Sequence, residues 1–364
     1  MQGGTGSFAT AGLVSALYVL GVASIAPLVG RMIDRLGPRP ILLLSAVIYP
    51  SALTAMVFCV EGGAATAWVA LAALCAGALL PPVTICMRTL FPRLIDDPDL
   101  LQTAYSVDSI LIETIFVAGP ALIAVFIALE WRSGAVLFAA ACAAVGSLLF
   151  LRAPPIREWV PQSSPQARSL LGPLRNAALR VLYLATMLYS IAFGLLEVAI
   201  TALATQQGRP AAAGIILALA SVGSGLGALI YGSRSWALPA PRQYVIAQMA
   251  MAGGLFAMAP VFNLYALALL CVLACSPMAP VLALQSMLIA RITPPAMLAE
   301  SFTWAATCLL GGVSAGIAVG GAIVEGHAPW GALLAAGTTT LAAALISARA
   351  LASADAIAAG RSAD

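Results

Sequence analysis

The chain has 364 residues, of which 62% are hydrophobic and 9% are charged, and its formal net charge is +3. Its mean hydropathy is +1.02. Soluble domains carry about 25% charged residues, so this composition excludes a soluble protein and predicts a polytopic membrane protein. The apolar runs are continuous, whereas the strands of a transmembrane barrel would alternate, so the predicted fold class is all-α.

The residue types that are missing exclude several kinds of chemistry. Every basic residue is an arginine, and His327 is the single histidine. An ATP-binding P-loop needs a lysine and a zinc H-E-x-x-H site needs two histidines, so neither is present. His327 is expected in a solvated loop beside Glu325. We therefore predict that the protein is not an enzyme and uses no cofactor and no metal.

About eleven apolar runs are long enough to cross a bilayer, because about 20 helical residues span its hydrocarbon core. They cover approximately residues 8–29, 41–60, 65–88, 101–128, 133–151, 180–204, 211–231, 243–260, 263–290, 297–323 and 328–352.

A short, positively charged connector joins the first two runs. It reads Gly30-Arg31-Met32-Ile33-Asp34-Arg35-Leu36-Gly37-Pro38-Arg39-Pro40. Three arginines against one aspartate predict a cytoplasmic loop by the positive-inside rule. Glycine permits close backbone approach and unusual turn conformations, which are the roles expected of Gly30 and Gly37.

The pattern G-x-x-x-D-R-x-G-x-R in this connector resembles the loop between helices 2 and 3 of the major facilitator superfamily (MFS). Pro38 departs from the common form, in which a basic residue stands there. The resemblance implies a transporter of two helical halves. It also implies a gating loop that contains Gly30, Asp34, Arg35, Gly37 and Arg39.

Members of that family normally have twelve helices, and this loop follows their second helix. Here the loop follows the first predicted span, so we expect that the family's first helix is absent from the chain as given. The expected domains are an N-terminal transmembrane half (1–152, helices 2–6 of the family), a cytoplasmic linker (153–179), a C-terminal half (180–353, helices 7–12) and a cytoplasmic tail (354–364).

The arginines predict the orientation of the chain. If the N-terminus lies outside, every arginine except Arg132 and Arg209 falls on the cytoplasmic side. Arginine in place of lysine and abundant alanine suggest a bacterial gene. The predicted location is therefore the plasma (inner) membrane of a bacterium, with the C-terminus in the cytoplasm.

Three runs carry polar residues on one helix face, since residues three or four apart share a face. The run 101–128 places there Gln102, Ser106, Ser109 and Glu113; the run 180–204 places Tyr183, Thr186, Ser190, Gly194, Glu197 and Thr201; the run 297–323 places Glu300, Thr303, Thr307, Gly311 and Ser314. Counted with the absent helix, these are helices 5, 7 and 11, which line the central cavity of the resembled family.

Two acids on these faces lie deep in the predicted membrane. The helical rise puts Glu113 about 18 Å from the cytoplasmic boundary, and Glu197 lies further out. Ionisable groups at such depth are costly, so they face water or a partner. Proton coupling or recognition of a cationic substrate is one interpretation, and a hydrogen-bonded structural acid is the other.

Asp108 and Glu300 have different surroundings. Asp108 lies about 140° around the helix from Glu113. It either pairs with Arg88 or takes part in transport. Glu300 lies near the inner interface, where we expect a loop arginine such as Arg35 or Arg39 to meet it. The rows Gly312/Gly316/Gly320 and Gly223/Gly227 are interpreted as surfaces for close helix packing.

These features predict a proton-coupled exporter of small organic compounds that works by alternating access as a monomer in the lipid bilayer, without nucleic acid. Gly119-Pro120 resembles the core of the family's antiporter motif, which implies efflux. Because acids but no arginines lie at mid-membrane depth, neutral or cationic substrates are favoured. Two alternatives stay open: a metabolite importer or facilitator, and a transport-dead scaffold that lacks one helix.

Overall fold

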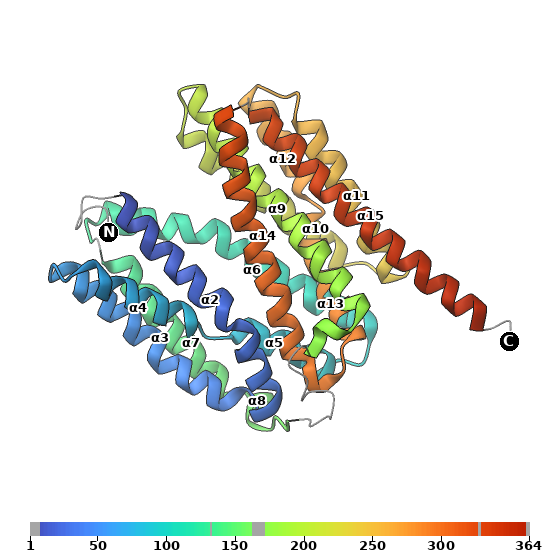
Figure 1. The fold of residues 1–364 in the computed structure, drawn as a ribbon, viewed down its shortest axis with the longest axis horizontal. Helices are drawn as coiled ribbons and strands as arrows, with labels where there is room; N and C mark the ends of the chain where they lie inside the picture. The colour runs from blue at the N-terminus through green and yellow to red at the C-terminus, as the bar shows by residue number, and fades with distance from the viewer. Residues whose placement is uncertain (1–7, 132, 162–171, 327–328, 362–364) are drawn as a thin grey trace. The chain divides into compact units, whose positions relative to one another are not determined.

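The computed structural model describes residues 8–131, 133–161, 172–326 and 329–361. His327, Arg132 and Arg168, together with parts of the predicted linker and tail, lie outside these residues. All the regular structure within the described ranges is helical, which confirms the predicted fold class (Figure 1).

The α-helices are α2 (Phe8–Leu36), α3 (Pro38–Glu61), α4 (Thr66–Ala78), α5 (Val83–Leu94), α6 (Pro98–Ala128), α7 (Gly134–Arg152), α8 (Pro154–Arg157), α9 (Ala177–Gln206), α10 (Ala211–Gly232), α11 (Ala240–Met258), α12 (Leu264–Cys275), α13 (Met278–Ile292), α14 (Leu298–Gly326) and α15 (Pro329–Arg361). Two short 3-10 helices, η2 (Gly172–Arg175) and η3 (Pro295–Met297), complete the described elements.

Ten segments of the described chain are helices long and apolar enough to cross a membrane, so the protein is a multi-pass membrane protein. Each of the ten coincides with a predicted run. The remaining predicted run, 243–260, coincides with α11, which is helical but is not one of the ten.

Two of the spans are broken helices, which the sequence interpretation had as continuous runs. One breaks between α4 and α5 at Pro81-Pro82, and the other breaks between α12 and α13 at Ser276-Pro277. Proline lacks the backbone N–H of a helical turn and its ring clashes with the preceding turn, so each break falls where the sequence places proline.

Most of the connector of residues 30–40 is helical, although the sequence predicts a loop there. Helix α2 runs on to Leu36 and α3 begins at Pro38, so Gly37 alone separates them. Gly37 has φ 82° and ψ 166°, a conformation that residues with a Cβ rarely adopt. The prediction of a turn at Gly37 is confirmed, whereas the prediction of a longer loop is wrong.

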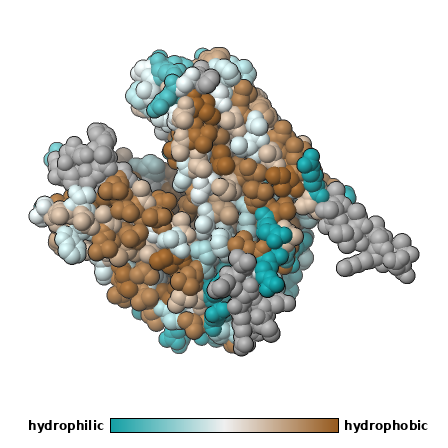
Figure 2. Space-filling model, in the orientation of Figure 1, coloured by the Kyte–Doolittle hydropathy of each residue, from teal (hydrophilic) through white to brown (hydrophobic). Residues whose placement is uncertain are grey.

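The described residues divide into two compact units. Unit 1 comprises residues 1–90, 120–172 and 294–307; unit 2 comprises residues 91–119, 173–293 and 308–364. In unit 1, α2 packs on α4 and α3 packs on α7; in unit 2, α9 and α11 pack on α15 and α10 packs on α12. Many apolar side chains lie on the surface, as expected for helices in lipid (Figure 2).

The two glycine rows pack helices closely, as the sequence predicts. Within unit 2, a Cβ added at Gly316 of α14 would lie 2.1 Å from the carbonyl oxygen of Ile191 on α9. A Cβ at Gly223 of α10 would lie 2.2 Å from the carbonyl oxygen of Val272 on α12. Real Cβ atoms do not approach backbone this closely, so a side chain at either position would push the helices apart.

Gly316→Ala should therefore destabilise the protein by about 1–3 kcal/mol, the usual cost of overpacking, because Ala cannot fit against the α9 backbone. Gly321→Ala on the same helix is the matched control, since a Cβ there meets nothing within 4 Å. The control should be neutral or slightly stabilising, because Ala favours helix. Thermal unfolding of the purified variants in detergent tests this, and equal midpoints would contradict the close packing.

Candidate functional site

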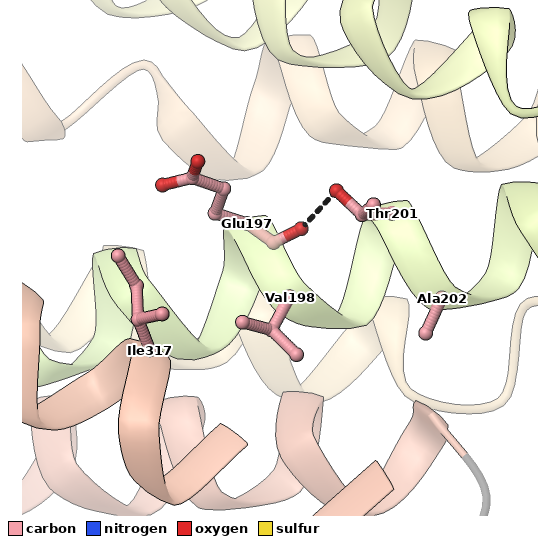
Figure 3. A pocket seen from close by; sticks show the side chains of 5 residues that line it. All are labelled: Glu197, Val198, Thr201, Ala202 and Ile317. Atoms are coloured by element: carbon pink, nitrogen blue, oxygen red, sulfur yellow. Dashed lines mark hydrogen bonds between the residues drawn. The ribbon is translucent and has the colours of Figure 1, made fainter. Parts of the chain in front are cut away.

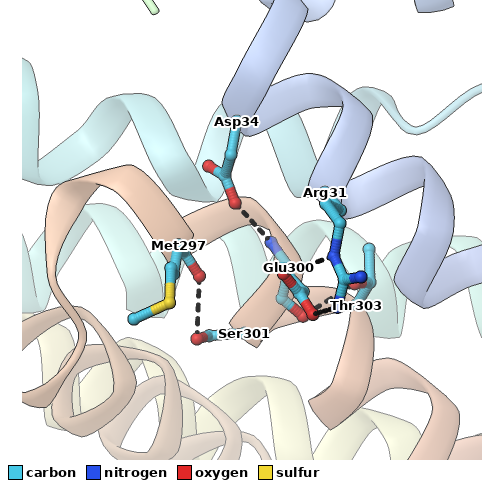
Figure 4. Close-up of polar contacts among 6 residues, drawn as sticks. All are labelled: Arg31, Asp34, Met297, Glu300, Ser301 and Thr303. Carbon is cyan, nitrogen blue, oxygen red and sulfur yellow. Dashed lines mark hydrogen bonds and ion pairs between the residues drawn. The ribbon is translucent and has the colours of Figure 1, made fainter. Parts of the chain in front are cut away.

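The end of α2 and the start of α14 share a buried polar contact within unit 1 (Figure 4). Asp34 is 3% exposed. Its Oδ1 accepts the backbone N–H of Ala299 at 3.0 Å, and its Oδ2 accepts that of Glu300 at 2.9 Å. The first N–H groups of a helix have no partner inside it, so Asp34 caps α14 from a residue 265 positions away in sequence. Its negative charge also suits the positive end of the helix dipole.

Arg31 and Glu300 form a two-point ion pair beside this cap. The Arg31 Nε lies 3.1 Å from Oε2 of Glu300, and its second terminal nitrogen lies 2.6 Å from Oε1. The Glu300 side chain is 2% exposed and that of Arg31 is 18% exposed. Arg31 and Asp34 are three residues apart, so they share the face of α2 that meets α14.

Gly30 makes the approach of these helices possible. A Cβ added there would lie 2.4 Å from Oγ1 of Thr303, 2.7 Å from Cα of Glu300 and 2.8 Å from the carbonyl oxygen of Ala299. Thr303 is itself buried, and its hydroxyl donates to the carbonyl of Glu300. We call Gly30, Arg31, Asp34 and Glu300 the latch.

The remaining predicted gating residues lie around the latch. Arg35 and Arg39 are exposed, and Gly37 forms the turn that follows. The structure pairs Glu300 with an arginine of the connector, as expected, and this arginine is Arg31 rather than the named examples Arg35 and Arg39. Arg31 has the right depth and face, because it lies one helical turn before Asp34.

Glu113 of α6 is buried within unit 2. It is 3% exposed, and its Oε1 accepts the hydroxyl of Ser224 on α10 at 2.8 Å. Its other oxygen, Oε2, is buried without a hydrogen-bond partner among the described residues. The described residues also offer no ion pair to this acid. Glu113 is thus a carboxyl whose charge is not balanced by a nearby cation.

The other polar residues on this face of α6 contact the end of α10. The side-chain amide of Gln102 donates to the carbonyls of Tyr231 and Arg234, each at 3.0 Å. A Cβ added at Gly232 would lie 2.5 Å from Cβ of Ser106. Ser109 is buried and donates to a carbonyl of its own helix. This face packs against a neighbour in the structure.

Asp108 is buried, and Arg88 is partly buried. They belong to different units, so their pairing stays a prediction. Thr307, at the edge of unit 1, is partly buried, and its hydroxyl has no hydrogen-bond partner among the described residues.

The part of the predicted α9 face nearer the N-terminus of the helix is buried in unit 2. Tyr183, Thr186 and Ser190 have exposed fractions of 3% or less. Nearby along the same helix, Tyr189 donates to the side chain of Gln285 on α13. Gln248 of α11 is completely buried, and neither polar atom of its amide has a hydrogen-bond partner in the described part of the chain. Sequence analysis did not single out Gln248, because α11 shows no polar stripe.

The part of the same face nearer the C-terminus of α9 reaches a hollow of about 320 Å³ (Figure 3). Glu197, Val198, Thr201, Ala202 and Ile317 line it. Glu197 is exposed, and the Thr201 hydroxyl donates to the backbone carbonyl of Glu197 at 2.7 Å. The hollow therefore combines one exposed carboxylate with an apolar wall and has no basic residue in its lining.

The comparisons with known proteins agree with this architecture. A family model of the Major Facilitator Superfamily matches residues 1–184, half of the chain. The chain therefore belongs to the major facilitator superfamily of membrane transporters, as the connector motif predicts. No curated protein matches the sequence.

Several solved transporters have a similar fold. The human organic anion transporter MFSD10 (TETRAN) is 20% identical, with a TM-score of 0.76 over 92% of this chain and 82% of its own. A bacterial homologue of the iron transporter ferroportin, in an outward-facing state, is 14% identical, with a TM-score of 0.77 over 95% and 91%. The E. coli fucose:proton symporter FucP is 15% identical, with a TM-score of 0.72 over 93% and 90%. At these identities the likeness extends to the fold alone.

The ion pair of the latch predicts strong coupling between Arg31 and Glu300. Arg31→Ala leaves Glu300 buried without a cation, which should cost about 3 kcal/mol of unfolding free energy. Glu300→Ala should cost less, because Arg31 reaches solvent. The double variant should cost clearly less than the sum of the two, because it removes the pair as a unit.

Unfolding of the three variants in detergent measures this coupling. Arg209→Ala is the control, because the side chain of this exposed arginine hydrogen-bonds to the Tyr265 hydroxyl at 3.3 Å and lies outside the latch. It should change stability by about 0.5 kcal/mol or less. Additive effects of Arg31→Ala and Glu300→Ala would mean that the ion pair contributes no coupling.

Proposed function

We propose that this transporter exports small neutral or cationic organic compounds across the bacterial inner membrane in exchange for protons. The observation that carries the proposal is the environment of Glu113, which is buried and hydrogen-bonded through Oε1 alone. Inside a membrane, a carboxyl without a cation partner has a much higher free energy in its ionised form than in its protonated form. Such a group suits reversible proton binding.

The surroundings of Glu300 differ from those of Glu113. Glu300 is equally buried, but Arg31 balances its charge at two points. This ion pair ties α2 to α14, so Glu300 has a structural role. Of these two buried acids, Glu113 is therefore the candidate for proton coupling. Asp108 remains a second candidate on the same helix.

The hollow beside Glu197 supports the substrate class. Its volume suits a small organic molecule, and pockets for such ligands are mainly apolar with few polar groups. A carboxylate in an apolar wall favours a cation with hydrophobic substituents and disfavours an anion. We propose that Glu197 and Thr201 belong to the substrate pathway.

The latch supports a gate at the cytoplasmic side. In the proposed cycle, the halves 1–152 and 180–353 rock about the substrate pathway, and the latch joins α2 to α14 whenever the inner side is closed. The linker 153–179 and the tail 354–364 are proposed to be cytoplasmic, and the N-terminus is proposed to lie outside. The polar α6 and α9 faces would then become accessible during the cycle.

Glu113→Gln should abolish proton-driven transport while the protein still folds, because glutamine keeps the shape and accepts from Ser224 but cannot ionise. The measurement uses inside-out vesicles with an acidic interior and ethidium as the cationic probe. Wild-type vesicles should accumulate ethidium. In the variant, the part of this accumulation that the pH gradient drives should fall at least about tenfold, as expected when an essential proton-transfer group is removed.

Glu197→Gln is the control acid. It should weaken ethidium binding to the purified protein but leave a residual response to the pH gradient. Driven transport that survives in Glu113→Gln and disappears in Glu197→Gln would exchange the two roles. Survival in both variants would remove proton coupling from these acids, and an absence of wild-type accumulation would contradict cation export.

A further inference from the structure

Ser224 of α10 joins three helices of unit 2 through one hydroxyl group. It is completely buried. Its Oγ donates to Oε1 of Glu113 on α6 at 2.8 Å and accepts the backbone N–H of Ala279 on α13 at 3.0 Å. The hydroxyl thus has one partner on the acid and another at the start of a different helix.

The second partner lies at the break in a membrane span. Helix α12 ends at Cys275, and α13 begins at Met278 after Ser276-Pro277. The residue that precedes α13 is Pro277, and it offers no side-chain cap. The N–H of Ala279 is one of the first-turn donors that a helix cannot satisfy itself, so Ser224 supplies the missing acceptor.

Close packing fixes α10 against the same break. A Cβ added at Gly227 would lie 1.7 Å from the carbonyl oxygen of Ser276, and the Gly223 position is equally tight against Val272. Ser224 lies between these two contacts. The hydroxyl therefore cannot move far from the break without separating α10 from α12.

Two hydroxyls of α10 lie near the Glu113 carboxyl: Ser224, which donates to Oε1, and Ser221, one turn earlier. On α12, the buried thiol of Cys275 interacts electrostatically with Glu113, and its sulfur lies 3.9 Å from that of Cys271. The other titratable or charged side chains on the packing helices are Tyr231 near the end of α10, Tyr265 near the start of α12 and Arg291 near the end of α13. On α6 itself, Asp108 lies five residues earlier.

A hydroxyl group has one proton, so its two hydrogen bonds depend on each other. Donation to an ionised carboxylate is charge-assisted, and it makes the hydroxyl oxygen a better acceptor for the N–H of Ala279. When the carboxyl gains a proton, the bond from Ser224 weakens, and so does the cap on α13. We propose that Ser224 is a positioning residue that transmits the protonation state of Glu113 to the α12–α13 break. This inference rests on the proposed coupling role of Glu113.

The first test is the pH dependence of driven ethidium transport in vesicles. Ser224→Ala and the nearly isosteric Ser224→Cys remove the strong donor, so the carboxyl should keep its proton to higher pH. The midpoint of the profile should move towards alkaline pH by about one unit. Ser224→Thr keeps the hydroxyl and should keep the wild-type midpoint even if less protein folds. Ser233→Ala, whose exposed hydroxyl donates to a local carbonyl, should leave the profile unchanged.

The second test observes the break directly. In a variant that keeps Cys275 as its single cysteine, alkylation by N-ethylmaleimide is compared at matched pH values with and without Ser224→Ala. The rate should depend on the state of Glu113 when Ser224 is present, and this dependence should decrease with Ser224→Ala and disappear with Glu113→Gln. The thiol senses the charge of Glu113 directly in every variant that keeps the acid, so the part of the dependence that Ser224→Ala removes is the part that the hydroxyl transmits.

The outcomes separate the two hypotheses. If Glu113→Gln keeps driven transport, the proposed coupling role of Glu113 fails. If Glu113→Gln loses driven transport, but Ser224→Ala and Ser224→Cys keep the wild-type midpoint and Ser224→Ala keeps the wild-type alkylation pattern, only the role of Ser224 is overturned. A shifted midpoint in Ser224→Ala and Ser224→Cys, with Ser224→Thr unchanged, supports the hydroxyl link.

Discussion

A carboxylate buried between membrane helices must find its hydrogen-bond donors inside the protein, because lipid offers none. Asp34 accepts two backbone N–H groups at the start of α14, and Glu300 accepts two hydrogen bonds from the guanidinium group of Arg31. Both solutions require the end of α2 to touch the start of α14, and Gly30 permits that approach. The most specific sequence motif of the chain therefore serves a long-range contact.

The same constraint divides the acids by role. Glu300 and Glu113 are about equally buried, yet only Glu300 has a cation beside it. Glu113 has hydroxyl groups beside it instead, with Ser224 donating to Oε1, and its Oε2 has no hydrogen-bond partner in the described part of the chain. Glu197 is exposed in an apolar hollow. Three glutamates in one membrane protein thus have three different surroundings, which suit structure, proton binding and ligand recognition respectively.

Much of the fold could be predicted from sequence, because the length and continuity of apolar runs are local properties. The prediction missed how far α2 extends beyond Gly30, since charged side chains at a helix end reach water while the backbone stays helical. It also missed the break at Pro277, which lies inside an apolar run. Helical periodicity predicted which helix face carries Glu300. It could not predict the ion-pair partner, because the pair forms between two helices that are distant in sequence. Ser224 was overlooked because a small residue between Gly223 and Gly227 fits plain packing.

In the proposed mechanism, Glu113 exchanges a proton during each transport cycle. The most direct measurement is proton movement itself, recorded with a pH-sensitive dye trapped in proteoliposomes to which ethidium is added without an imposed gradient. Ethidium-dependent proton flux is expected for the wild type and none for Glu113→Gln, while that variant still exchanges ethidium across the membrane. Equal proton flux from the wild type and from Glu113→Gln would contradict this mechanism.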